Sequence, residues 1–149
     1  MAVAVIFIDQ LTKFLALEFL TIFEYVPVLG DLLGWRLAFN DRAAFSLGGG
    51  STWIFTLTST IAMLLLIYFV PRFHTRGWLL LGGTALGGVV GNLIDRITKS
   101  PGFPNGHVVD FIQIPFNFPV FNIADMAISI SAFLVVVRVI RGDKIGGNK

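Results

Sequence analysis

The feature that most constrains this chain is a run of 20 residues, at positions 51–70, that contains no charged side chain. A helix needs about 20 apolar residues to cross the hydrocarbon core of a bilayer. Residues 77–94 form a second uncharged run of 18, and residues 111–137 form a third with Asp125 as its single charge. Charged residues make up 13% of the 149 residues, whereas soluble domains carry roughly 25%. The sequence therefore predicts a membrane protein and excludes a disordered chain.

The N-terminal segment is also apolar, although Asp9 and Lys13 interrupt it. These two charges and the lack of a preceding basic region distinguish it from a secretory signal peptide, so we interpret it as a transmembrane helix. The last helix is expected to start near Pro119, because proline suits a first turn and not a helix interior. The predicted fold is an all-α polytopic membrane protein, a single domain over residues 1–149. Its four transmembrane helices are expected at roughly 1–21, 51–70, 77–96 and 119–140.

The distribution of Lys and Arg indicates the orientation. Cytoplasmic loops of membrane proteins carry an excess of these residues. Six of the 11 lie between the second and third helices or after the fourth: Arg72, Arg76, Arg138, Arg141, Lys144 and Lys149. Both termini are therefore expected in the cytoplasm, with outer loops at about 22–50 and 97–118.

The first outer loop predicts a small extracytoplasmic subdomain. Residues 33–39 partly alternate between apolar side chains and others. This pattern favours either a short strand or an interfacial segment.

Ionisable residues inside transmembrane segments are costly and usually mark functional sites. Asp9 and Lys13 are four residues apart and share a helix face. One interpretation is a self-neutralising pair that docks the first helix on the bundle. The other is that the pair supports a catalytic site, and both can hold together.

The third helix combines a glycine stripe with a polar cluster. Glycines at positions 83, 87 and 91 recur once per turn, which predicts a close-packing surface for another helix. Asn92, Asp95 and Arg96 then cluster at the outer end. Arg96 is expected either to neutralise Asp95 within the helix or to reach a headgroup phosphate.

Two more aspartates lie near the outer boundary. Asn122 and Asp125 repeat the Asn-x-x-Asp spacing, and Asp125 is expected about 9 Å below the outer helix end, since it follows Pro119 by six residues. Asp110 lies in residues 108–112, interpreted as an apolar re-entry into the membrane. The structural alternatives are that Asp125 only hydrogen-bonds to a neighbouring helix and that Asp110 is a loop acid at the membrane interface.

Two carboxyl groups close together at a membrane surface favour acid–base chemistry. One pKa rises because both groups cannot easily ionise, so one carboxylate activates a water while its protonated partner polarises a carbonyl. The absence of cysteine from the sequence excludes thiol nucleophiles and cysteine metal sites. No His-Glu-x-x-His, Gly-x-Ser-x-Gly or phosphate-loop motif occurs. The alternative class is a small transporter with aspartates at positions 9, 95, 110 and 125 as ion sites.

Five motifs in order resemble those of the lipoprotein signal peptidases, also called signal peptidase II. Each motif alone is weak, but together they cover nearly the whole chain. They are Asp-Gln-Leu-Thr-Lys at 9–13, Asn-Asp-Arg-Ala-Ala-Phe-Ser at 40–46, Gly-Asn-Leu-Ile-Asp-Arg at 91–96, Val-Val-Asp-Phe at 108–111 and Phe-Asn-Ile-Ala-Asp at 121–125.

The resemblance implies an aspartyl endopeptidase of the bacterial cytoplasmic (inner) membrane, with its active site facing the outer side. Asp110 and Asp125 would form the catalytic dyad. The substrate would be a prolipoprotein with diacylglycerol on its lipobox cysteine, cleaved just before that cysteine. No cofactor, metal or nucleic acid is implied; the partners would be membrane lipid and the peptide antibiotic globomycin. Supporting or substrate-binding residues would be Asp9, Lys13, Asn40, Ala44, Phe45, Asn92, Asp95, Arg96 and Asn122.

The first outer loop departs from the family pattern at one position. Arg42 stands where the family usually has glycine, and arginine tolerates a positive φ less readily. We also hypothesise that Trp35, Phe39 and Phe45 form a cradle or lid that limits water at the dyad.

Overall fold

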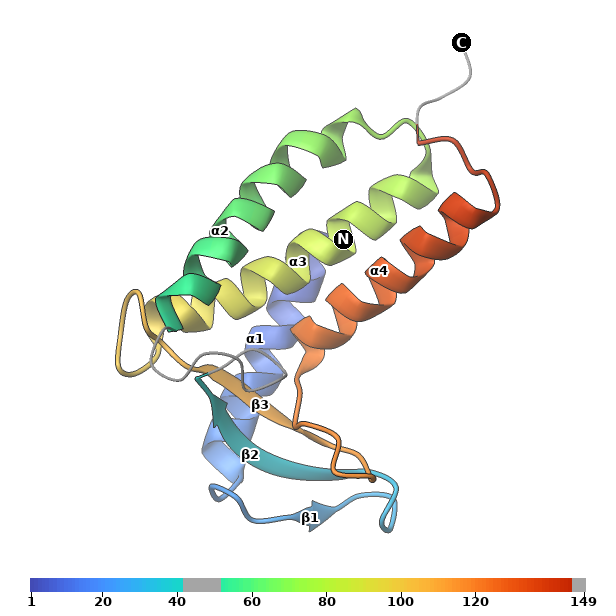
Figure 1. Cartoon of the computed structure of the whole chain (residues 1–149). Helices are drawn as coiled ribbons and strands as arrows, with labels where there is room; N and C mark the ends of the chain where they lie inside the picture. Colours follow the sequence, from blue (N-terminus) through green and yellow to red (C-terminus); the bar gives the residue numbers. More distant parts are fainter. Residues whose placement is uncertain (42–51, 146–149) are drawn as a thin grey trace.

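The computed structural model describes residues 1–41 and 52–145. Its sheet lies at one end of a group of helices, and α1 runs behind the others to reach that sheet (Figure 1). The elements in order are α1 (Ala2–Phe19), β1 (Val26–Pro27), β2 (Gly34–Asn40), α2 (Thr52–Phe69), a 3-10 turn (Val70–Arg72), α3 (Arg76–Thr98), β3 (Val108–Gln113) and α4 (Ile123–Ile140).

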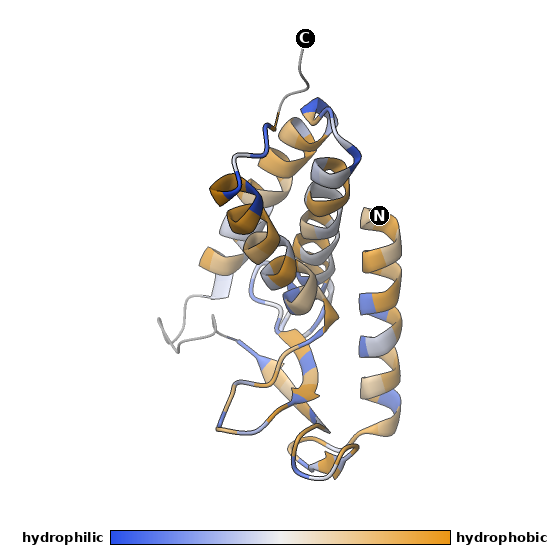
Figure 2. Ribbon diagram, turned by 90° about the vertical axis from the view of Figure 1, so that its right-hand side faces the viewer, coloured by the Kyte–Doolittle hydropathy of each residue, from blue (hydrophilic) through white to orange (hydrophobic). Residues whose placement is uncertain are grey.

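Three of the described helices, α2, α3 and α4, are long and apolar enough to cross a membrane. The span that contains α2 has a mean hydropathy of 2.1, yet only 6% of it is buried inside the protein. Apolar, orange residues make up much of the helix ribbons (Figure 2), and such residues left unburied are expected where a helix contacts lipid. The prediction of transmembrane helices is supported for these three. The 18-residue α1 carries Asp9, Lys13 and Glu18, and it is not among the three helices that meet this criterion of length and apolar character.

The glycine stripe of α3 packs against α1, as predicted. A Cβ added at Gly87 would lie 2.6 Å from Val5 Cβ, and one at Gly91 would lie 2.6 Å from Asp9 Oδ2. A Cβ added at Gly88, on a neighbouring face, would lie 2.5 Å from the backbone carbonyl oxygen of Ala124 in α4. The small residues therefore let α1 and α4 approach the α3 backbone.

The outer subdomain is an antiparallel sheet with the order β1-β2-β3. Of the two alternatives for residues 33–39, the short strand is confirmed, as β2. The expectation of a membrane re-entry at 108–112 is wrong, because these residues form β3 and pair with β2. The α1 helix ends against this sheet, and its Ala16 joins a core cluster with Leu37, Val109, Phe111 and Ile112.

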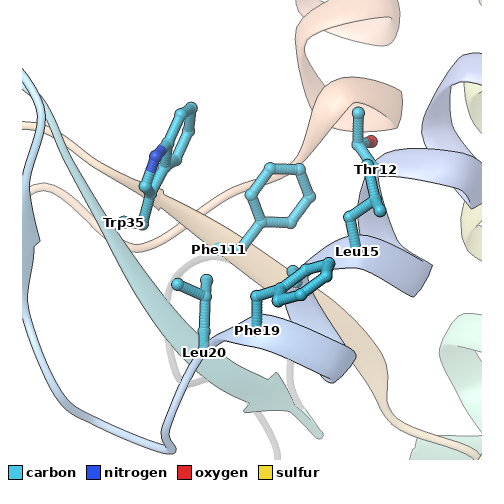
Figure 3. Close-up of a pocket in the computed structure, with 7 residues that line it drawn as sticks. Thr12, Leu15, Phe19, Leu20, Trp35 and Phe111 are labelled. Atoms are coloured by element: carbon cyan, nitrogen blue, oxygen red, sulfur yellow. The ribbon is translucent and has the colours of Figure 1, made fainter.

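An apolar cavity of about 280 Å³ remains between α1 and the sheet. Trp35 and Phe111 form one wall, with ring centroids 5.9 Å apart, and α1 forms the other (Figure 3). Neighbouring side chains of a strand point to opposite faces. Phe111 therefore faces this cavity while the preceding residue, Asp110, faces away from it.

The fourth helix begins later than predicted. Asn122 is the N-cap and Ile123 the first helical residue, so the expected start near Pro119 is wrong by four residues. The reason is a long-range contact: Phe121 forms a β-bridge with Ile112, which keeps the preceding chain extended. Asp125 consequently lies in the first turn, about 3 Å along the helix and not the 9 Å that was expected.

Candidate active site

Asp110 lies on β3 and is 1% exposed. Both of its carboxylate oxygens accept hydrogen bonds from asparagine amides. Asn122 Nδ2 donates to Oδ1 at 2.6 Å, and Asn40 Nδ2 donates to Oδ2 at 2.9 Å. The strand register brings Asn40 to this position, since Ala38 pairs with Asp110 and Asn40 with Val108. The sheet thus holds one acid of the predicted pair in a fixed orientation.

Asp125 is half-buried in the first turn of α4. Asn92 Nδ2 donates to its Oδ1 at 2.7 Å, and the backbone N–H of Asn122 donates to its Oδ2 at 3.3 Å. The Asn122 side chain in turn accepts a 2.9 Å hydrogen bond from the Asp125 N–H. This reciprocal arrangement is a capping box, which satisfies two otherwise unpaired donors at a helix start.

The two aspartates therefore share Asn122, which contacts both carboxylates. Burial raises the pKa of Asp110 from its ordinary value of 3.8 to about 7, and repulsion from the Asp125 carboxylate contributes to this rise. The amides of Asn40 and Asn122 and the charge of Lys13 lower the pKa, because each stabilises the ionised form. A carboxyl group that titrates near neutral pH is suited to general acid–base chemistry.

Behind this pair lies a buried ion cluster of Asp9, Lys13 and Asp95, each at most 1% exposed. Lys13 Nζ lies 2.9 Å from Asp9 Oδ2 and 2.9 Å from Asp95 Oδ2. The Ala124 N–H donates to Asp9 Oδ1 at 2.9 Å, and the Val109 N–H donates to Asp95 Oδ2 at 3.1 Å. The cluster thus ties α1 to α3, α4 and β3. Asp95 pairs with Lys13 and not, as one prediction had it, with Arg96.

Asn92 joins the buried ion cluster to the aspartate pair. It is 7% exposed, and its Oδ1 accepts hydrogen bonds from Lys13 Nζ at 2.9 Å and from Asn122 Nδ2 at 3.1 Å. Its Nδ2 donates to Asp125. Eight of the eleven predicted site residues, all but Ala44, Phe45 and Arg96, therefore form one connected network.

Arg96 makes no hydrogen bond to this network among the described residues, but it lines, with Asn92, a groove of about 320 Å³ between α2, α3 and α4. The groove is lined by Thr58, Ser59, Ala62, Val89, Asn92, Arg96 and Ile128. Among the described residues, the Arg96 guanidinium lies 6.0 Å from the centroid of the Phe55 ring and has no hydrogen bond or ion pair. It is half-buried, so its donors are available to a ligand in the groove.

Two polar contacts of the structure were not predicted from the sequence. Gln10 Nε2 lies 3.2 Å from both Asp9 Oδ2 and Asp95 Oδ1, and its position beside Asp9 in an apolar segment was a signal. The buried Thr56 hydroxyl donates to the Pro104 carbonyl at 2.6 Å. A threonine within an uncharged run gives no indication in the sequence of such a contact.

The predicted aromatic lid is only partly within the described chain. Ala44 and Phe45, like Arg42, lie outside the described residues. Trp35 lines the cavity beside α1 and not the groove that contains Arg96. Phe39 is 41% exposed. Within residues 1–41 and 52–145, no group of three or more His, Asp or Glu side chains is arranged to hold a metal ion.

The sequence comparisons agree with one another. The family model described as "Signal peptidase (SPase) II" matches residues 1–141. A lipoprotein signal peptidase of Leifsonia xyli is 43% identical over 148 residues, which cover 99% of this chain and 68% of the relative. A lipoprotein signal peptidase of Mycobacterium leprae is 40% identical over 151 residues, which cover 99% of this chain and 75% of the relative.

Solved structures are similar over nearly the full length. One, described as a bacterial membrane enzyme, has a TM-score of 0.78 at 29% identity and covers 99% of this chain and 92% of its own. A second with the same description has a TM-score of 0.77 at 28% identity, with coverages of 96% and 91%. The arrangement of helices and sheet is therefore that of a known kind of bacterial membrane enzyme.

Proposed function

The chain belongs to the signal peptidase II family, and on that premise we propose that it removes signal peptides from lipoproteins by aspartyl chemistry. Membership makes it a membrane protease that cleaves lipoprotein signal peptides in the bacterial inner membrane. The catalytic mechanism and the identity of the cleaved peptide bond are what we propose. Asp110 and Asp125 would activate water against the peptide bond that precedes the diacylglyceryl-modified cysteine.

The observation that carries this proposal is the sharing of Asn122 by the two aspartates. Asn122 contacts Asp110 at 2.6 Å through its amide and Asp125 at 3.3 Å through its backbone N–H. One carboxylate takes a proton from the water, and the other, protonated, donates to the scissile carbonyl and then to the leaving amine. The pKa of Asp110 near 7 supports a proton resident on the pair at neutral pH.

The groove that contains Arg96 suits the substrate. Its walls come from the three membrane-length helices, and its lining includes Asn92, which donates to Asp125. A signal peptide that lies in this groove would bring its end to the aspartates. The guanidinium of Arg96, which has no hydrogen bond or ion pair among the described residues, would then hold a carbonyl oxygen of the peptide or of the lipid esters.

The proposed topology follows from charge and packing. We infer that α1 also crosses the membrane, because its charges Asp9 and Lys13 are buried against α3 while Phe7 and Phe14 are 66% and 61% exposed. With both termini in the cytoplasm, the sheet and the aspartate pair face the outer side. Globomycin is expected to compete with the lipoprotein at this pair.

The decisive experiment is a cleavage assay on a diacylglyceryl-modified prolipoprotein, read as a gel shift. Asp110→Asn and Asp125→Asn should each abolish cleavage, because an amide can neither accept the proton of water nor donate a carboxyl proton. Asp143→Asn, at the opposite end of the bundle, is the matched control and should cleave normally. Retained cleavage in either dyad variant would overturn the assignment.

A further inference from the structure

We propose that Lys13 is a positioning residue, which orients the Asn92 amide and through it the Asp125 carboxylate. The inference rests on the proposed aspartyl function. It assigns the buried ion cluster a task beyond helix docking. Lys13 touches neither aspartate of the pair, so any catalytic effect must pass through a neighbour.

All three N–H donors of the Lys13 ammonium have an acceptor. An ammonium group has three N–H donors, and three oxygens lie at 2.9 Å from Nζ: Asp9 Oδ2, Asp95 Oδ2 and Asn92 Oδ1. The side chain is 1% exposed, so water does not compete for these donors. The two carboxylates hold the ammonium in place, and its third donor is aimed at Asn92.

The N–H of Lys13 that is bonded to Asn92 determines the orientation of the Asn92 amide. Rotating the amide by 180° would turn its NH₂ toward the ammonium and its carbonyl toward Asp125. Donor would then face donor at Lys13, and acceptor would face acceptor at Asp125. The positive charge behind Asn92 thus makes its amide a committed donor to Asp125 Oδ1, at 2.7 Å.

The Asn92 carbonyl also helps to hold Asp110, through Asn122. Asn92 Oδ1 accepts from Asn122 Nδ2 at 3.1 Å, and Asn122 Nδ2 donates to Asp110 Oδ1 at 2.6 Å. A disoriented Asn92 would therefore release Asp125 directly and loosen the Asn122 amide. Geometric errors of about 1 Å in a catalytic group can cost about 100-fold in rate.

The charged groups around the pair define how orientation can be separated from electrostatics. Facing it are Asp9 and Lys13 from α1, Asp95 and Arg96 from α3, Asp110 itself on β3 and Asp125 on α4; α2 contains no charged residue. The buried ion cluster holds two negative charges and one positive charge, a net charge of −1. Lys13→Met changes it to −2, whereas Lys13→Met/Asp9→Asn restores −1 without restoring the donor to Asn92.

The test measures kcat, KM and the pH–rate profile of prolipoprotein cleavage for the wild type and these two variants. We expect Lys13→Met to lower kcat about 100-fold and to shift the profile to higher pH, because loss of a nearby cation raises carboxyl pKa values. The charge-restoring double variant should return the profile toward that of the wild type while kcat stays low and KM changes less than kcat. Recovery of kcat in the double variant would overturn the proposal in favour of a purely electrostatic role.

A second arm tests whether Lys13 acts through Asn92. Adding Asn92→Ala to Lys13→Met/Asp9→Asn should lower kcat no further than Asn92→Ala alone, because coupled residues are not additive. Gln10→Met, which alters the same cluster but leaves Lys13 on Asn92, should keep the wild-type pH profile. Thermal unfolding identifies the folded variants. If Lys13→Met does not fold, the charge-restored variant Lys13→Met/Asp9→Asn is compared with the wild type in its place. Additive losses would refute the proposal, whereas a wild type that fails to cleave would refute the proposed function instead.

Discussion

Asn122 donates a 2.6 Å hydrogen bond to Asp110 and, through the same side chain, accepts the helix-capping N–H of Asp125 at 2.9 Å. Its amide end supports the acid on the sheet, and its carbonyl end begins the helix that carries the other acid. The side chain of Asn122 therefore contributes to the position of both aspartates. The capping role of this residue and its role in holding Asp110 should be separable by substitution.

Asn122→Ser keeps a capping oxygen but loses the amide donor to Asp110. We expect it to keep the helix cap, since serine is about as good an N-cap as asparagine, although it also loses the buried amide hydrogen bonds to Asn92, Val109 and Asp110. Cleavage should fall about 100-fold, as for other losses of a preorganised donor. Asn122→Ala is the control, because it loses the same amide and also the cap, so it should be ~1 kcal/mol less stable than Asn122→Ser. Equal activity of the serine variant and the wild type would contradict this assignment.

Asp110 should make the stability of the protein depend on pH. Its pKa is raised from 3.8 to about 7, so the folded protein binds this proton more tightly than the unfolded chain does. The resulting stabilisation is fully present below pH 3.8 and is lost as pH rises through about 7. Melting temperatures in detergent across this range should fall less steeply for Asp110→Asn, which cannot titrate. Identical slopes for the two proteins would show that Asp110 titrates normally.

The membrane helices were predictable, because hydrocarbon thickness sets their length, and the uncharged runs in the sequence indicate it directly. The start of α4 was not, since it depends on the bridge between Phe121 and Ile112. The β3 strand was missed for a related reason. Its residues are buried on both faces, so the apolar residues on either side of Asp110 do not alternate with polar ones, and periodicity cannot distinguish them from a membrane segment.

The candidate site was predictable residue by residue but not as a network. The spacing of Asp9 and Lys13 predicted their contact, because i and i+4 share a helix face. The bridge from Lys13 to Asp95 depends on how α1 packs on α3, which no local pattern contains. Asn122 was identified through a motif, yet its contact with Asp110 requires the sheet and α4 to meet.

The close approach of α1 to α3 predicts that Gly87 tolerates no side chain. A Cβ there would lie 2.6 Å from Val5 Cβ and 2.8 Å from the Ala2 carbonyl oxygen, so Gly87→Ala must push α1 away. We expect a loss of about 1–3 kcal/mol, typical of overpacking, together with lower activity, because the displaced α1 carries Lys13. Gly83→Ala is the matched control, since its nearest neighbour would be Met1 Cβ at 3.3 Å. A Gly87→Ala variant as stable as Gly83→Ala, by thermal unfolding, would argue against this packing.

Arg96 should contribute to substrate binding without belonging to the aspartate network. Its guanidinium lines the groove between α2, α3 and α4, with the Phe55 ring as its described partner. A hydrogen bond from a charged donor contributes roughly 1.5–3 kcal/mol, so Arg96→Gln should lower kcat/KM by about 10- to 100-fold, mainly through KM. Arg138→Gln removes an arginine that pairs with Asp143 at 3.5 Å and stacks over Trp78, and this control should leave KM unchanged. A KM for Arg96→Gln equal to that of the wild type would exclude the guanidinium from the substrate site.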